Sequence, residues 1–100
     1  MKASEWIDRF KAKRQIDSDY RAAKVLGLSR NAISNYRNGT PTMDEKTAIS
    51  LARELGERPE AIVIDQMAER ATDPTLRASL REMARGLCML CLIGSGPRLA

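Results

Sequence analysis

The chain has 100 residues, of which 43% are hydrophobic and 30% charged, a balance typical of one small folded domain, with or without an oligomerising tail, and not of a disordered protein. The scarcity of aromatic residues (4%) disfavours a β-sandwich, and the absence of His removes the commonest general base, which disfavours a stand-alone catalyst. The net charge of +4 favours a polyanionic partner without identifying one.

Helical periodicity recurs along the chain, whereas strand-like alternation is scarce. Apolar spacing, capping side chains and helix-ending glycines predict helices over residues 3–14, 20–26, 29–38 (with Ser29 as its cap), 42 or 44 to 55, and 59–71, and a sixth helix that opens at 72–74. We therefore expect an all-α fold. Its predicted organisation is a domain at 1–58, C-terminal helices at 59–93 and a flexible tail at 94–100.

Positive charge is concentrated in the first part of the chain. Residues 1–42 carry nine basic and four acidic side chains, whereas residues 59–100 carry five of each. A local excess steers a polyanion better than a uniform net charge does. We expect any such partner to bind the N-terminal part.

The last predicted helix carries a regular apolar stripe at spacings of 4, 3, 4 and 3. The stripe consists of Leu76, Leu80, Met83, Leu87 and Leu90. It predicts self-association into a homodimer, with packing on the protein's own core as the open alternative. Gly86 within the run costs about 1 kcal/mol relative to Ala, and the stripe is too short for an independent coiled coil.

Cys88 and Cys91 form a C-x-x-C pair within the longest apolar run. A redox motif of this kind normally follows a strand, and a zinc site would need four thiolates shared by a dimer, since the chain has no His. Structural packing is therefore favoured, and we expect no metal and no cofactor. No secretion signal is visible, and the run of seven apolar residues is far short of the about 20 that span a bilayer, so we expect a cytoplasmic protein without membrane contact.

The segment from Asp19 to Asn38 has the spacing of two helices joined by a tight turn. Ala23 supplies a small residue where the helices cross, and Gly27, four residues later, permits a left-handed turn. Apolar Leu28, Ile33 and Tyr36 would pack the second helix on a core. The remaining face of that helix is polar, as expected of a helix that enters the major groove: Arg30, Asn31, Ser34, Asn35, Arg37 and Asn38.

This segment resembles the Cro/lambda-repressor-like (XRE) family of helix-turn-helix regulators. The resemblance rests on Ala23, Gly27, Ser29, Ile33, Tyr36 and the Asn38-Gly39 end, and it continues through residues 47–56. It covers about residues 4–63 and implies a lambda-repressor-like helix-turn-helix bundle with a C-terminal helical extension. The small size and the appended helices are similar to those of a phage or prophage repressor.

The resemblance also implies which residues would contact DNA. The family's base-reading positions fall on Arg30, Asn31 and Asn35, and Arg suits guanine whereas Asn suits adenine. Contacts to the DNA backbone are predicted for residues of the first helix of the pair, of the second helix and of the loop that follows: Tyr20, Arg21, Lys24, Ser29, Ser34, Arg37, Asn38 and Thr40.

The chain departs from the family pattern at two places. Family members often carry a phosphate-contacting Gln where this chain has Asp19, and we expect Asp19 to cap its helix instead. The loop of residues 39–42 lacks the Lys or Arg of stronger binders. Both departures predict a modest affinity for one domain, which dimerisation would raise.

We therefore expect a non-enzymatic, sequence-specific regulator that binds duplex DNA at an inverted-repeat operator, most simply a homodimeric phage-type repressor. One alternative is an antitoxin that binds its own promoter and a toxin. A second is a protein-binding adaptor that reuses the fold, and a third is a thiol-based sensor that depends on Cys88 and Cys91. No nucleophile–base pair, phosphate loop or carboxylate pair indicates catalysis, and no small-molecule substrate is evident.

Overall fold

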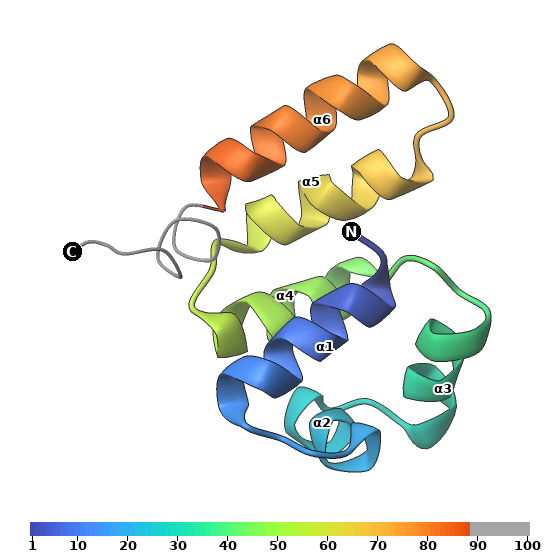
Figure 1. Ribbon diagram of the computed structural model, residues 1–100, viewed down its shortest axis with the longest axis vertical. Helices are drawn as coiled ribbons and strands as arrows, with labels where there is room; N and C mark the ends of the chain where they lie inside the picture. Colours follow the sequence, from blue (N-terminus) through green and yellow to red (C-terminus); the bar gives the residue numbers. More distant parts are fainter. Residues whose placement is uncertain (89–100) are drawn as a thin grey trace.

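The computed structural model describes residues 1–88, and within them the chain forms six α-helices and no strand. The helices are α1 (Ala3–Arg14), α2 (Asp19–Leu26), α3 (Arg30–Asn38), α4 (Glu45–Leu55), α5 (Pro59–Arg70) and α6 (Pro74–Leu87). Helices α1 to α4 form one part of the molecule, and α5 and α6 form an antiparallel hairpin above it (Figure 1). The all-α prediction is confirmed.

Four of these helices begin at a side chain that accepts a hydrogen bond from the backbone amide three residues later. The capping residues are Ser18, Ser29, Asp44 and Asp73. This arrangement satisfies one of the free amides in each first turn. Asp44 begins the fourth helix, so the alternative start at Thr42 is excluded. The expectation for Asp19 was wrong: Ser18 caps α2, and Asp19 is the first residue of the helix.

The core is built from helices α1 to α4 and the first half of α5. Phe10 of α1 and Leu51 of α4 are fully buried, and Ala61 and Ile62 of α5 belong to the same apolar cluster. The domain boundary predicted after residue 58 stays a prediction, but the apolar core continues across it, since residues on both sides belong to one cluster. Helix α5 is thus fixed against the part of the chain that carries α2 and α3.

Helix α6 lies on the outside of the molecule and packs chiefly on α5. Leu80 and Leu87 of the predicted stripe are half-buried, whereas Leu76 and Met83 are each 52% exposed. Leu90, the last residue of the stripe, lies outside the described residues. The stripe therefore serves packing within the chain in part and leaves two large apolar side chains in solvent.

Cys88 is buried and follows the last residue of α6, while Cys91 lies outside the described residues. Among residues 1–88, no three or more His, Cys, Asp or Glu side chains are grouped so that they could hold a metal ion. None of the helices in this range is both long and apolar enough to cross a membrane.

Candidate nucleic-acid interface

Helices α2 and α3 are joined by a tight turn at Gly27. Its φ of +73° lies in the left-handed region, and the next amide, that of Leu28, donates to the Ala23 carbonyl at 2.8 Å. A Cβ at Gly27 would meet nothing within 4 Å, so the glycine is needed for its backbone conformation and not for space. Ala23 is buried. The predicted turn is confirmed, and it sets α3 against α2.

Helix α3 presents one polar face to solvent and one face to the protein. Ile33 is buried, Ala32 and Tyr36 are half-buried, and the Tyr36 hydroxyl donates to Thr47 Oγ1 at 3.3 Å. The outward face carries the three predicted base readers and two of the predicted backbone contacts, all exposed: Arg30, Asn31, Ser34, Asn35 and Asn38. Helical periodicity predicted these five residues on the outer face, whereas Arg37, which was predicted with them, is half-buried.

An exposed aromatic ring on α2 lies between two cations. Tyr20 is 50% exposed, and the Arg30 guanidinium carbon lies 5.1 Å from the centre of its ring. Lys24 Nζ lies 5.4 Å from the same ring centre. Both distances are within the range of cation–π attraction. The ring thus connects a predicted base reader on α3 with predicted backbone contacts on α2.

Arg37, which was predicted to contact a phosphate, is bound by carboxylates of the protein. Its Nε and Nη2 donate to the two oxygens of Asp19 at 2.8 Å each, and Nη2 also donates to Asp8 at 2.7 Å. Arg37, aided by Lys11, holds the pKa of the Asp19 carboxyl well below its usual range. A phosphate could reach Arg37 only by displacing a carboxylate, so the geometry favours a positioning role between α2 and α3.

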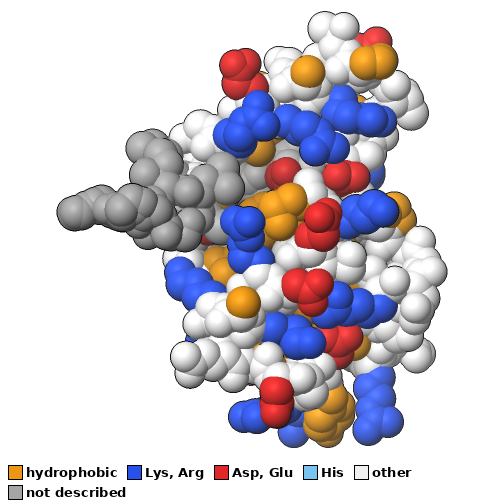
Figure 2. Space-filling model, viewed as in Figure 1, with side chains coloured by type: hydrophobic (Ala, Val, Ile, Leu, Met, Phe, Trp, Pro, Cys, Tyr) orange, Lys and Arg blue, Asp and Glu red, His pale blue; other side chains and the backbone are white. Residues whose placement is uncertain are grey.

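Much of the predicted positive charge is likewise engaged within the protein. Lys11 donates to Asp19, Lys13 to the Leu55 carbonyl, and Arg14 to Glu54. The face in Figure 2 accordingly interleaves Lys and Arg with Asp and Glu instead of gathering them into one basic patch. The charge excess of residues 1–42 therefore overstates the positive surface that this part of the chain offers to a polyanion.

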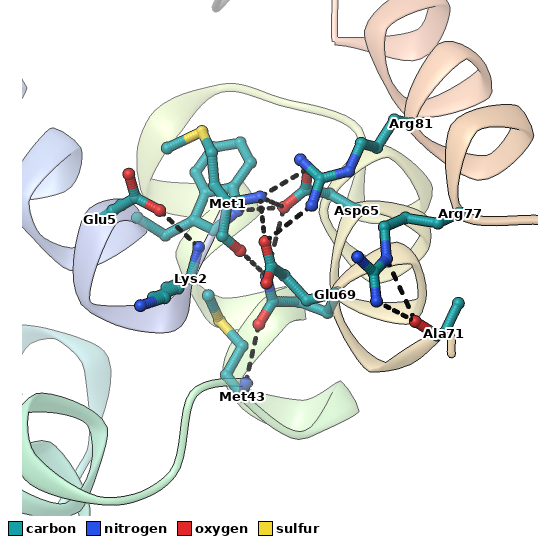
Figure 3. Close-up of polar contacts among 11 residues, drawn as sticks. Met1, Lys2, Glu5, Met43, Asp65, Glu69, Ala71, Arg77 and Arg81 are labelled. Carbon is teal, nitrogen blue, oxygen red and sulfur yellow. Dashed lines mark hydrogen bonds and ion pairs between the residues drawn. The ribbon is translucent and has the colours of Figure 1, made fainter. Parts of the chain in front are cut away.

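The loop between α3 and α4 is held by the N-terminus and by α5. The Ala3 amide donates to the Pro41 carbonyl, and the Met43 amide donates to Gln66 Oε1, each at 2.8 Å. Gln66 is 1% exposed, and its Nε2 donates in turn to the Met1 carbonyl at 2.8 Å. Figure 3 shows Met1 and Met43 beside side chains from this part of α5. Sequence reasoning missed Gln66, although a polar residue four positions after the apolar Ile62 was a signal.

The three remaining predicted backbone contacts are all exposed. Ser29 caps α3, Thr40 is exposed in the loop, and Arg21 is exposed with only a 3.4 Å ion pair to Asp17. Such an exposed pair is weak, so a phosphate could compete for Arg21. Asn38 Nδ2 donates back to the Ser34 carbonyl at 3.1 Å, which orients its amide at the end of α3.

Comparison with known proteins agrees with this geometry. A family model described as helix-turn-helix matches residues 11–62, which include the whole of α2, α3 and α4. The chain is also 36% identical over 58 residues to the uncharacterized protein Gp-c of Pseudoalteromonas phage PM2. The match covers 58% of this chain and 62% of the phage protein. No solved structure matches significantly.

The family model covers more than half of the chain and includes the whole α2–turn–α3 unit. Turn geometry, the polar outer face of α3 and the family match lead to the same assignment. The chain belongs to the helix-turn-helix family of DNA-binding regulators, of the Cro/lambda-repressor-like type.

Proposed function

We propose that the protein binds duplex DNA sequence-specifically as a homodimer and represses transcription by occupying a promoter, as a phage-type repressor. The observation that carries the proposal is the outer face of α3, where Arg30, Asn31 and Asn35 are exposed together on a helix fixed by its inner face. The similarity to a phage protein supports the phage-type assignment.

In this proposal α3 enters the major groove and reads base edges. Arg30 and Asn31 lie in its first turn, and Asn35 lies one turn further along the same face. Arg can donate two hydrogen bonds to O6 and N7 of guanine, and Asn can form a matching pair with N6 and N7 of adenine. One helical turn advances about 5.4 Å, so the two ends of this face would read neighbouring base pairs.

Small polar groups and two cations around α3 would fix its register on the duplex. The groups proposed for the DNA backbone are Tyr20, Arg21, Lys24, Ser29, Ser34, Asn38 and Thr40. Contacts of this kind position the protein without carrying sequence information. The two cations of each subunit would together neutralise about four phosphates in a dimer, so these groups would give a slope of log affinity against log salt of about −4.

The concentration of exposed apolar side chains on α5 and α6 supports a homodimer that forms through α6. Of the five exposed large hydrophobic residues among those described, three lie on α5 and α6: Met67, Leu76 and Met83. Burial of these side chains against a second copy would remove apolar surface from water. A two-fold dimer of this type addresses half-sites roughly 34 Å apart on one face of the duplex.

The test is substitution of the proposed base readers, measured on the duplex that the protein retains from a random pool. Asn31→Ala and Asn35→Ala should each weaken binding to the best site by about 1–3 kcal/mol and relax preference at one base pair. Ala78→Ser, an exposed change on the face of α6 opposite Leu76 and Met83, is the control and should leave binding unchanged. Equal weakening on all sequences would assign the residue to the backbone, and unchanged binding by both variants would contradict the proposal.

A further inference from the structure

We propose that Arg70, at the end of α5, binds a backbone phosphate of the duplex in a groove beside α3. This inference rests on the proposed DNA-binding function and adds to it a contact from outside the α2–turn–α3 unit. The part of the chain around Arg70 carries no basic cluster, and the residue lies beyond the segment that the helix-turn-helix model matches.

The groove runs between α3, the loop that follows it and the C-terminal end of α5. It has a volume of about 370 Å³, and its polar lining consists of Asn35, Tyr36, Thr40, Thr42, Asp44 and Arg70. Asn35 is a proposed base reader and Thr40 a proposed backbone contact. Arg70 therefore opens onto the space that a duplex docked on α3 would border.

Arg70 is available for an anion, unlike the arginines that carboxylates of the protein bind. Arg14, Arg37 and Arg81 form ion pairs with carboxylates, whereas Arg70 forms none with the described residues. Its side chain is exposed, and its hydrogen bond to the protein is a long one, from Nη1 to the Met43 carbonyl at 3.4 Å. A guanidinium in this state keeps donors for a bidentate phosphate contact.

The loop that forms one wall of the groove is fixed before DNA arrives. The hydrogen bonds from the Ala3 amide to Pro41 and from the Met43 amide to Gln66 hold its backbone on both sides of Thr42. The amide of Thr40 donates to the Asn35 carbonyl at 2.7 Å. The hydroxyls of Thr40 and Thr42 are therefore presented at the groove by a braced backbone, which lowers the entropy cost of binding.

Asp44 places a negative charge in the groove, so phosphate binding there depends on the positive charge of Arg70. Its carboxylate caps α4, and hydrogen bonding by Thr47 keeps the pKa of Asp44 below its usual range, so the negative charge persists at neutral pH. No other Lys or Arg lines this groove among the described residues. Arg70 thus supplies the positive charge that the loop of residues 39–42 lacks, from a helix that is far from the loop in sequence but borders the same groove.

The experiment measures affinity for the selected duplex over a range of salt concentrations with Arg70→Gln and Arg70→Lys. For a dimer, Arg70→Gln should make the log–log salt slope shallower by about 2 and weaken binding about tenfold at about 150 mM salt, equally on all sequences. Arg70→Lys keeps the charge and should keep the slope. Arg58→Gln removes the same charge at the other end of α5, where it should leave both quantities unchanged.

Each contrary outcome has a distinct meaning. Weaker binding by Arg70→Gln with an unchanged slope would show that Arg70 only holds the loop at Met43, and unchanged binding would show that it has no role; either result overturns the inference. The DNA-binding proposal would stand in both cases if Asn31→Ala and Asn35→Ala relax base preference. Thermal unfolding of each variant, followed by helical circular dichroism, checks that all compared proteins are folded.

Discussion

Tyr20 shows how a single side chain on α2 can affect readout by α3. Its ring lies within cation–π distance of both Lys24 and Arg30, and the residue is 50% exposed. Attraction of this strength at an exposed site is about 0.5–1 kcal/mol. It is enough to bias Arg30 toward one orientation before DNA binds.

Two variants separate the ring of Tyr20 from its hydroxyl. Tyr20→Phe keeps the ring and should retain the base preference that Arg30 confers, whereas Tyr20→Leu should reduce that preference about two- to fivefold. The measurement compares binding to the selected duplex with binding to duplexes changed at the base pair that responds to Arg30→Ala. Equal losses of affinity in both variants, with base preference intact, would contradict the cation–π role and leave only the proposed contact of Tyr20 with the DNA backbone.

The Asp19–Arg37 ion pair makes a prediction about stability and pH. Because the folded pKa of Asp19 is lowered, its contribution is present above the unfolded value of about 3.9 and is lost as pH falls through the folded pKa. Urea unfolding followed by the fluorescence of Trp6, the single tryptophan, should show a steeper fall in stability below about pH 4 for the wild type than for Asp19→Asn. Equal pH dependence would contradict this account.

A double-mutant cycle isolates the same pair. Asp19→Asn combined with Arg37→Gln should reveal a coupling of about 1 kcal/mol at pH 7, since the contact is bidentate but partly exposed. Neither residue could be paired from sequence. They are 18 positions apart, and only the turn at Gly27 brings the start of α2 next to the end of α3.

At the scale of elements, periodicity and caps were sufficient to predict the helices of residues 1–88, because each signal is local. The errors occur where several residues could play one role. Ser18 and Asp19 both carry capping oxygens, and the choice depends on tertiary contacts: Arg37 and Lys11 bind the Asp19 carboxylate, which leaves the cap to Ser18. Gln66 and Arg70 were missed for the same reason, since their partners lie in a loop far away in sequence.

Helix α6 carries the prediction for the dimer. Leu76→Asp with Met83→Asp should give folded monomers by light scattering, because both side chains are largely exposed within one subunit. Charges at the half-buried Leu80 and Leu87 would instead disturb packing on α5. Loss of the dimer in such variants could then result from unfolding and not from a broken interface. Ala78→Asp, an exposed change on the opposite face of α6, is the control and should remain dimeric. A dimer that persists with Leu76 and Met83 both changed would place the interface elsewhere.

At the scale of the whole molecule, α5 connects the two proposed surfaces. It braces the loop beside α3 through Gln66 and carries α6 on its other side. The molecule measures 38 × 34 × 18 Å, so two copies joined near α6 are large enough to span half-sites about 34 Å apart. Because α5 is attached rigidly to the core, the way in which two copies pack at α6 would determine the distance between their two α3 helices.

Sequence-specific binding is tested by selection from random duplex DNA at about 150 mM salt, followed by sequencing of the retained pool. We expect an enriched inverted repeat whose half-site centres are about 10 base pairs, or 34 Å, apart. Protein carrying Asn31→Ala and Asn35→Ala together should lose that enrichment while remaining folded. If the folded wild-type protein enriches no sequence, base readout by α3 is wrong, and its exposed polar face must serve a protein partner.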